Sequence, residues 1–272
     1  MTNRAGVIGM PIRHSLSPAI FTAAFEAVGL DWTYEAFEVP VGEGAAFAER
    51  VRHDLIGLSV TMPHKEAVVR AVDDLSDVAR DLGAVNCIAR RDGRLVGHNT
   101  DGPGLVDSLA IDESLDLTGM RGVLLGAGGA GRAVARALGA AGVRLVVVNR
   151  SPERAAAAVA LAGPGARAGS LDDVAEADLV VNATSVGMAG DPSSPVPAGA
   201  LHREQVIVDL VYHPSVTPLL ADAARAGART VGGLGMLVHQ AAHAFRLWTG
   251  IDAPVEAMRA GAEAGLAARA AG

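Results

Sequence analysis

A glycine-rich turn between a strand and a helix constrains the fold of this chain more than any other feature. Residues 121–125 predict a buried strand, which runs directly into Gly126-Ala127-Gly128-Gly129-Ala130-Gly131 at the start of a helix. The glycines fit the spacing G-x-G-x-x-G, and residues 145–149 predict a second strand that ends about 20 residues after the turn. This order of elements is typical of an open α/β sheet with parallel strands. The sequence therefore predicts an α/β fold.

The chemistry of such a turn explains its glycines. A diphosphate group must approach backbone N–H groups at a helix N-terminus, and a Cβ atom would block that approach. We therefore expect a dinucleotide to bind at Gly126, Ala127, Gly128, Gly129 and Ala130. The alternative is a tight strand-to-helix turn that binds no ligand.

The tip of the second strand indicates which dinucleotide binds. An NAD site usually ends this strand with Asp or Glu, whose carboxylate binds the ribose hydroxyls. Here the strand ends in Asn149-Arg150-Ser151, and Arg154 follows one helical turn later. Two guanidinium groups and two small polar side chains suit a 2′-phosphate, so the sequence favours NADP(H). The alternative is a helix start with ordinary surface arginines.

Lys65 is the only lysine in the 272 residues. The chain carries 23 lysine and arginine residues, and every other one is arginine. Arginine stays protonated at any working pH, whereas an ammonium group can give and take a proton. We interpret Lys65 as a candidate acid–base group. The alternative is that drift toward arginine left one lysine behind by chance.

Other polar side chains follow the predicted strands of the first third. Because ligands bind at the carboxyl ends of parallel strands, these side chains are expected to lie close together. They are His14, Ser15 and Ser17 after a strand at 6–9, Thr61 and Lys65 after a strand at 55–61, and Asn86 and Asp101 further on. Each one alone has a structural explanation as a cap or turn residue.

Local patterns predict further elements. Ser17 is expected to cap a helix that begins at Pro18 and ends near residue 28. Asp92-Gly93 predicts the turn of a hairpin over residues 84–98, and Pro63 leads into a helix that begins near His64. Strands are also expected at 32–39, 178–182 and 206–210, and helices at 43–52 and 236–248.

Composition and charge exclude several classes of function. The net charge of −7, the pI of about 5.6 and the 3% aromatic content argue against a nucleic-acid-binding protein. Although 50% of the residues are hydrophobic, no stretch is long and apolar enough to predict a transmembrane helix. The N-terminus leads directly into the first strand without a signal-peptide pattern, so we expect a cytoplasmic protein.

The sequence also argues against a metal site. Cys87 is the only cysteine, which excludes an intramolecular disulfide and a multi-thiolate metal site. His239 and His243 have the spacing of a zinc-protease helix, but Gln240 stands where that motif needs a glutamate general base. We expect no metal cofactor.

Taken together and in order, these motifs resemble the shikimate dehydrogenase family over nearly the whole chain. The blocks that carry the resemblance are Gly9-Met10-Pro11-Ile12-Arg13-His14-Ser15-Leu16-Ser17-Pro18, Val60-Thr61-Met62-Pro63-His64-Lys65, Gly83-Ala84-Val85-Asn86, Asn99-Thr100-Asp101-Gly102, the Gly126 turn, Asn149-Arg150-Ser151, Asn182-Ala183-Thr184-Ser185-Val186-Gly187-Met188 and Gly235-Met236-Leu237-Val238-His239-Gln240-Ala241-Ala242.

The resemblance implies two α/β domains with the active site in the cleft between them. A substrate-binding domain would comprise residues 1–103 and the C-terminal helices at 234–272, and a Rossmann-like NADP-binding domain would be inserted at 104–233. Lys65 and Asp101 would form the proton-transfer pair. The residues expected to bind shikimate are Ser15, Ser17, Thr61, Lys65, Asn86, Asp101, Tyr212 and Gln240. Four further residues are expected to touch the cofactor, in addition to the glycine turn and the arginines: Asp77, Thr184, Leu210 and Gly233.

Two positions depart from the family pattern. The family usually has asparagine where this chain has Ser59, and threonine where it has Cys87.

The expected reaction is NADPH-dependent, reversible reduction of 3-dehydroshikimate to shikimate by a monomer or homodimer. Ser59 leaves open a dehydrogenase for quinate or an aminated shikimate analogue, and a non-catalytic NADP-binding regulator is the alternative from another class.

Overall fold

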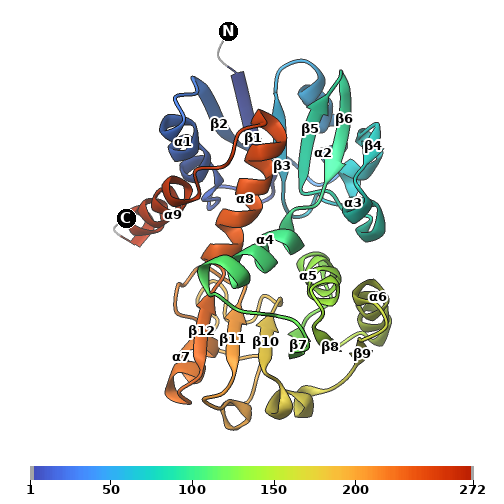
Figure 1. Cartoon of the computed structure of the whole chain (residues 1–272). Coiled ribbons are helices and arrows are strands. Elements are labelled where there is room, and N and C mark those ends of the chain that lie inside the picture. Colours follow the sequence, from blue (N-terminus) through green and yellow to red (C-terminus); the bar gives the residue numbers. More distant parts are fainter. Residues whose placement is uncertain (1–2, 271–272) are drawn as a thin grey trace. The chain divides into compact units, whose positions relative to one another are not determined.

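The computed structural model describes residues 3–270 and divides the chain into two compact units. Unit 1 comprises Met1–Gly104 and Val238–Gly272, and unit 2 comprises Leu105–Leu237. Each unit is built on its own six-stranded sheet (Figure 1). The predicted α/β class with two α/β domains is confirmed.

The sheet of unit 1 mixes parallel and antiparallel strands in the order β2-β1-β3-β5-β6-β4. The strand β1 pairs in parallel with β2 and β3, whereas β3 pairs antiparallel with β5. The predicted hairpin is confirmed, because β5 and β6 pair antiparallel and both Asp92 and Gly93 have positive φ. The strands are β1 (Asn3–Gly9), β2 (Trp32–Glu38), β3 (Gly57–Val60), β4 (Asp74–Leu75), β5 (Cys87–Arg91) and β6 (Arg94–His98).

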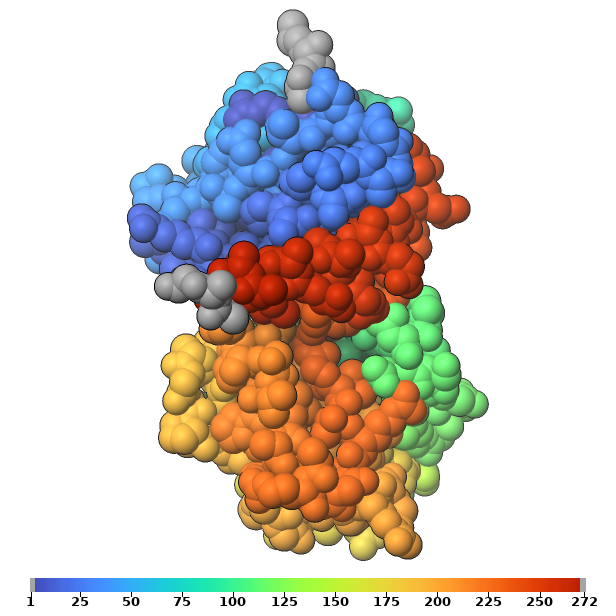
Figure 2. Space-filling view, turned by 90° about the vertical axis from the view of Figure 1, so that its left-hand side faces the viewer, coloured from blue at the N-terminus to red at the C-terminus, as the bar shows by residue number. Residues whose placement is uncertain are grey.

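Close helix packing covers this sheet. Gly57 leaves room for the indole of Trp248, since a Cβ there would lie 2.3 Å from Trp248 Nε1, and that nitrogen donates to the carbonyl of Ile88 at 3.0 Å. Gly261 lets α9 approach α1 closely, and the red C-terminal helix lies against the blue N-terminal segment in Figure 2. The helices are α1 (Ser17–Ala27), α2 (Gly44–Ala48), α3 (Asp77–Leu82), α4 (Asp101–Asp107), α8 (Leu234–Thr249) and α9 (Val255–Ala270), with short 3-10 helices η1 (Glu49–Arg52) and η2 (Ala67–Ala71).

Two local predictions in unit 1 are wrong. Ser17 is the first residue of α1 rather than its cap: the N-cap is Leu16, and the Ser17 N–H donates to Ser15 Oγ at 3.2 Å. No α-helix begins near His64 either, and only the short η2 follows. The carbonyl of Lys65 accepts the Val85 N–H at 2.8 Å, so a contact distant in sequence competes with the local helical hydrogen bond.

Unit 2 has the doubly wound topology that the glycine turn predicts. All its strand pairs are parallel, in the order β12-β11-β10-β7-β8-β9. The strand order reverses between β7 and β10, and ligands of such sheets bind at the carboxyl ends of the strands at this switch point. The strands are β7 (Arg121–Leu125), β8 (Arg144–Val148), β9 (Arg167–Ala168), β10 (Leu179–Asn182), β11 (Val206–Asp209) and β12 (Arg229–Gly232).

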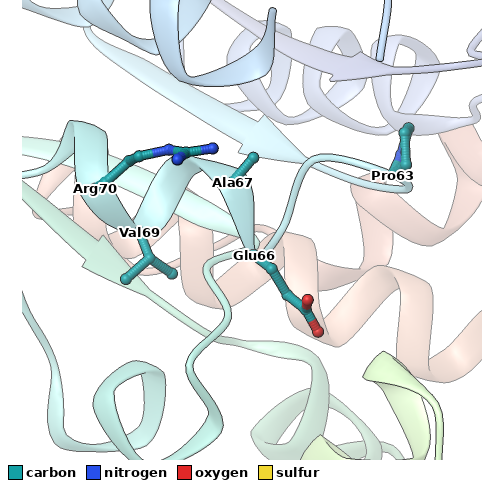
Figure 3. Close-up of a pocket in the computed structure, with 5 residues that line it drawn as sticks. All are labelled: Pro63, Glu66, Ala67, Val69 and Arg70. Carbon is teal, nitrogen blue, oxygen red and sulfur yellow. The ribbon is translucent and has the colours of Figure 1, made fainter. Parts of the chain in front are cut away.

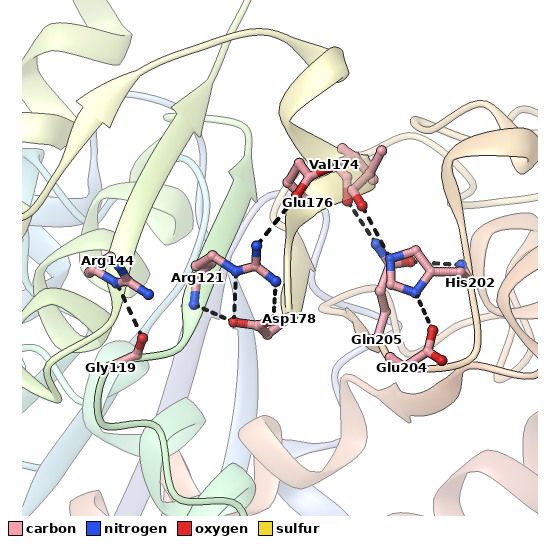
Figure 4. Close-up of polar contacts among 10 residues, drawn as sticks. Gly119, Arg121, Arg144, Val174, Glu176, Asp178, His202, Glu204 and Gln205 are labelled. Atoms are coloured by element: carbon pink, nitrogen blue, oxygen red, sulfur yellow. Dashed lines mark hydrogen bonds and ion pairs between the residues drawn. The ribbon is translucent and has the colours of Figure 1, made fainter.

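Polar contacts tie the amino ends of these strands together (Figure 4). The Arg121 guanidinium donates to Asp178 Oδ1 at 2.7 Å, and Gln205 Nε2 donates to the buried carbonyl of Val174 at 2.7 Å. These contacts stabilise the edge of the sheet opposite the glycine turn. The helices of unit 2 are α5 (Gly129–Ala140), α6 (Pro152–Ala162) and α7 (Pro218–Arg225), with the π-helix η3 (Ser108–Asp112) and the 3-10 helices η4 (Leu171–Glu176) and η5 (Ala198–Ala200). Within residues 3–270, no helix has the length and apolar character of a membrane span.

Candidate active site

Lys65, Asp101 and Asn86 form a hydrogen-bonded network in unit 1. Lys65 Nζ lies 2.6 Å from Asp101 Oδ2, and Asn86 Nδ2 donates to Asp101 Oδ1 at 2.7 Å. The side chains of Lys65 and Asp101 are 20% and 9% exposed, so a bulk-water shell does not screen the ion pair fully. Both carboxylate oxygens thus have a donor, and the aspartate is fixed relative to the ammonium group.

The backbone holds these three side chains in place. Asn86 precedes β5, and its carbonyl accepts the Val60 N–H of β3 at 2.7 Å. The side-chain oxygen of Asn86 accepts the Thr100 N–H at 2.8 Å, and Asp101 is the first residue of α4. Sequence analysis missed Thr100 as a supporting residue, although it lies inside a recognised motif, because only the fold shows which side chain its N–H meets.

The other predicted substrate-binding residues of unit 1 lie on or next to α1, β3 and α8. Ser15 precedes α1, Thr61 follows β3, and both are half-buried. Gln240 lies on α8, where a Cβ added to Gly104 would be 2.6 Å from the Gln240 backbone nitrogen. Gly104 therefore allows α4, which carries Asp101, to pack directly against α8 at Gln240. Ser17 is buried at the start of α1, and Tyr212 belongs to unit 2, after β11.

A surface pocket next to Lys65 in sequence does not contain these groups. It has a volume of about 470 Å³ and is lined by Pro63, Glu66, Ala67, Val69 and Arg70. Figure 3 shows the Glu66 carboxylate pointing away from the Arg70 guanidinium. The pocket brings no acid–base pair together, whereas the Lys65–Asp101 network does.

The glycine turn in unit 2 contains two kinds of glycine: those that the backbone conformation or packing requires, and those that have open space beside them. Gly126 has φ +98°, and a Cβ on Gly131 would lie 2.2 Å from the Gly126 carbonyl oxygen. Gly128 and Gly129, in contrast, have nothing within 4 Å of an added Cβ. Packing explains the first pair. Bare backbone in open space at the start of α5 fits the close approach of a diphosphate.

The residues predicted to bind the 2′-phosphate have unequal structural roles. Asn149 Oδ1 accepts the Ala127 N–H at 3.1 Å, which ties the tip of β8 to the glycine turn. Ser151 caps α6 by accepting the Arg154 N–H at 3.3 Å, and it also donates to Glu153 Oε2 at 2.7 Å. Arg150 and Arg154 are exposed. The carboxylate of Glu153 at this tip is a feature that sequence analysis missed.

The four remaining predicted cofactor residues lie in both units. Asp77 is an exposed residue in the first turn of α3 in unit 1. In unit 2, Thr184 Oγ1 donates to Asn182 Oδ1 at 2.7 Å, and its methyl carbon lies 2.9 Å from a Cβ built on Gly126. Gly233 packs on the Leu210 carbonyl oxygen, 2.3 Å from an added Cβ. Thr184 therefore borders the glycine turn directly.

A doubly wound unit with an open glycine turn, together with a partly buried lysine–aspartate pair, defines a nicotinamide-dinucleotide oxidoreductase. The shikimate dehydrogenase (NADP(+)) of Thermococcus kodakarensis is 44% identical over 269 residues, which cover 97% of this chain and 97% of that protein. The chain belongs to the shikimate dehydrogenase family.

Family models and solved structures agree with this membership. Residues 7–88 match the shikimate dehydrogenase substrate binding domain, 233–260 the shikimate 5′-dehydrogenase C-terminal domain, and 122–213 the coenzyme F420-dependent NADP oxidoreductase family. The shikimate 5-dehydrogenase of Thermus thermophilus, in complex with NADP(H) and shikimate, superposes with a TM-score of 0.92 at 42% identity, covering 97% of this chain and all of that one. A quinate dehydrogenase from Corynebacterium glutamicum in complex with NAD has a TM-score of 0.87 at 32% identity, covering 97% and 99%.

No group of three or more histidine, cysteine, aspartate or glutamate side chains among residues 3–270 is arranged to hold a metal ion.

Proposed function

We propose that this protein catalyses the NADPH-dependent, reversible reduction of 3-dehydroshikimate to shikimate. Membership of the family supports the reaction class. The observation that carries the proposal is the 2.6 Å contact between Lys65 Nζ and Asp101 Oδ2, because it holds the only transferable side-chain ammonium of the chain against a fixed carboxylate.

Lys65 acts as the proton donor and acceptor at the C3 oxygen of the substrate. In the reducing direction the ammonium group protonates the developing alkoxide, and in the oxidising direction the neutral amine accepts the hydroxyl proton. Asp101 orients the amine, and Asn86 holds Asp101 through its second carboxylate oxygen. A side chain fixed by such contacts loses little entropy on reaching the reactive geometry.

The remaining residues hold the substrate and cofactor. Unit 1 supplies Ser15, Ser17, Thr61 and Gln240 to bind the hydroxyls and carboxylate of shikimate, with Tyr212 from unit 2. The NADP(H) ligands would be the glycine turn with its open Gly128 and Gly129, Asn149, Arg150, Ser151 and Arg154 around the 2′-phosphate, and Asp77, Thr184, Leu210 and Gly233 elsewhere. When bound, NADPH supplies the hydride that reduces the C3 carbonyl.

A small panel of substrates and cofactors tests the proposal. Absorbance at 340 nm is followed with NADP and shikimate, with NADP and quinate, and with NADP alone, and each assay is repeated with NAD. We expect the highest kcat/KM with NADP and shikimate. Absence of turnover with shikimate and either cofactor would refute the proposed reaction.

Ser59 favours two alternative substrates within the family. Serine removes the amide that the family usually presents at this position, so quinate or an aminated shikimate analogue is the alternative substrate. A higher kcat/KM for one of them than for shikimate would reassign the enzyme. As a biosynthetic NADPH-dependent enzyme it would act in the cytoplasm, as a monomer or homodimer.

A further inference from the structure

The tip of β8 presents a carboxylate among the predicted 2′-phosphate ligands. Glu153 is exposed in the first turn of α6, between Ser151 and Arg154 in the sequence. Its Oε2 accepts the Ser151 hydroxyl at 2.7 Å. Sites for NAD use a carboxylate at this tip to bind the ribose hydroxyls, whereas sites for NADP use arginine to accommodate the 2′-phosphate. The structure therefore combines arginines that suit NADP with a carboxylate that does not.

The Ser151 hydroxyl has no proton left for a second acceptor. A serine hydroxyl donates one O–H and accepts with its lone pairs. The Ser151 O–H donates to Glu153, and its oxygen accepts the Arg154 N–H at 3.3 Å as the cap of α6. While these contacts persist, Ser151 cannot donate to a phosphate oxygen. Binding of a 2′-phosphate through this hydroxyl therefore requires the contact with Glu153 to break.

Neighbouring contacts hold Ser151 and Glu153 in position. Asn149 Nδ2 donates to the Ser151 carbonyl at 3.0 Å, and Asn149 Oδ1 accepts the Ala127 N–H of the glycine turn at 3.1 Å. Pro152 is the first residue of α6, and its ring restricts the backbone between the two side chains. The carboxylate is thus joined through Ser151 and Asn149 to the glycine turn.

The carboxylate also adds a negative charge at this tip. Hydrogen bonds from the Ser151 hydroxyl and from its own backbone N–H lower the pKa of the Glu153 carboxyl, and no arginine within residues 3–270 contributes to the shift. The group is therefore ionised at neutral pH. Because like charges repel, this carboxylate opposes a phosphate group but not the uncharged ribose hydroxyl of NADH.

We propose that Glu153 is a specificity-determining residue that weakens the preference of this enzyme for NADP(H) over NAD(H). Its carboxylate acts in two ways: it engages the Ser151 hydroxyl, and it adds a like charge where the 2′-phosphate binds. NADH has no 2′-phosphate, so neither effect reduces its affinity. The inference rests on the proposed function, which assigns Arg150, Ser151 and Arg154 to the 2′-phosphate.

The test measures the dissociation constants of NADPH and NADH by fluorescence titration of the wild type, Glu153→Ala and Glu153→Gln. Alanine removes both the charge and the acceptor, so NADPH should bind about 5- to 10-fold more tightly. Glutamine removes the charge and keeps an oxygen for Ser151, so its gain should be about 2- to 3-fold and should disappear in about 1 M salt. The affinity for NADH should stay the same in both variants.

Two further variants separate this role from a structural one. Glu204→Ala removes the same charge directly before β11, at the sheet edge opposite the glycine turn, and should change neither constant. Ser151→Gly removes the hydroxyl with little loss of capping, so adding Glu153→Ala to it should give only the gain seen with Glu153→Gln. Removal of a first-turn carboxylate destabilises a helix, which would weaken binding. A gain in NADPH affinity is therefore not what a merely structural role would produce.

The outcomes distinguish this inference from the proposed function. Unchanged or weaker NADPH binding in Glu153→Ala, or an equal gain for NADH, would overturn the role of Glu153. These constants do not depend on turnover, so the result is independent of the assay with shikimate. Equal losses of NADPH and NADH affinity on replacing Arg150 and Arg154 would instead refute the 2′-phosphate site itself.

Discussion

Both units contain a buried asparagine–aspartate pair, and the two pairs differ in one partner. In unit 1, Asn86 Nδ2 donates to Asp101 at 2.7 Å, and in unit 2, Asn182 Nδ2 donates to Asp209 at 2.9 Å. The second oxygen of Asp101 lies 2.6 Å from the Lys65 ammonium, whereas the second oxygen of Asp209 accepts the hydroxyl of Thr217 at 2.6 Å. One carboxylate therefore faces a cation and the other only neutral donors.

This difference suits the two aspartates to different roles: Asp101 to catalysis and Asp209 to stabilising the fold. Asp209 also accepts the Val211 N–H at 3.0 Å, so its bonds join the ends of β10 and β11 to the start of α7. Burial raises the pKa of the Asp209 carboxyl. Asp101 instead holds an ammonium group that can transfer a proton. The cation, and not the buried carboxylate, therefore marks the candidate catalytic site.

The largest expected effect comes from Lys65→Arg. Arginine keeps the charge beside Asp101 but does not release a proton, so kcat should fall by about 10²- to 10⁴-fold with a modest change in substrate KM. Steady-state kinetics at saturating NADPH, with NADPH binding measured separately as the control, checks this. Near-normal turnover in the variant would remove the distinction between the two aspartates.

The second-largest effect is expected from the exposed arginines at the tip of β8 in unit 2, and it concerns the affinity for NADPH. Replacing both Arg150 and Arg154 with alanine should weaken NADPH binding about 10- to 100-fold and leave NADH binding nearly unchanged, because only NADPH carries the 2′-phosphate. Fluorescence titration with both cofactors measures the two dissociation constants. Arg203→Ala, which removes another exposed guanidinium of unit 2, is the matched control. Equal losses for both cofactors would contradict the 2′-phosphate assignment.

Two glycines of the turn separate ligand binding from folding. Gly131→Ala places a Cβ against the Gly126 carbonyl and should cost about 1–3 kcal/mol of unfolding free energy. Gly128→Ala meets no protein atom, so the fold should keep its stability while NADPH affinity drops. Urea unfolding and NADPH titration of both variants give the two readouts. A Gly128→Ala protein with wild-type affinity would show that the open space beside Gly128 is not used by the cofactor.

Local spacing predicted the parts of the molecule that depend on local geometry. The G-x-G-x-x-G turn could be predicted because its requirements are local. Gly126 has positive φ, and a Cβ on Gly131 would meet the carbonyl of Gly126. The hairpin at Asp92-Gly93 could be predicted because its turn also depends on the positive φ of neighbouring residues. The family prediction is confirmed, and the resemblance, rather than any spacing rule, paired Lys65 with Asp101.

Contacts between distant parts of the chain were beyond local patterns. The Val85 N–H comes from a distant part of the chain, donates to the Lys65 carbonyl and so removes that carbonyl from a local helix. The partner of Asn182 is Asp209, which lies 27 residues away in the sequence. Such features follow from strand order, which the order of motifs does not specify.

The smallest expected effect is the pH dependence of stability in Asp209→Asn. The pKa of Asp209 is raised in the folded state, so its contribution to stability is full below the unfolded pKa of about 3.9 and is lost as the pH rises through the folded pKa. The asparagine amide can donate to Thr217 Oγ1, so the variant should lack this loss and be more stable at neutral pH by about 1 kcal/mol. Thermal midpoints measured from acid to neutral pH test the slope.

Asp178→Asn provides the control of opposite sign. The hydrogen bonds from Arg121 lower the pKa of Asp178, so its stabilisation is present above the unfolded pKa and is lost as the pH falls through the folded value. This variant should therefore lose stability at neutral pH and approach the wild type in acid. If Asp209→Asn behaves in the same way as Asp178→Asn, the hydrogen bonds to the Asp209 carboxylate outweigh the effect of its burial, and the predicted pH dependence is wrong.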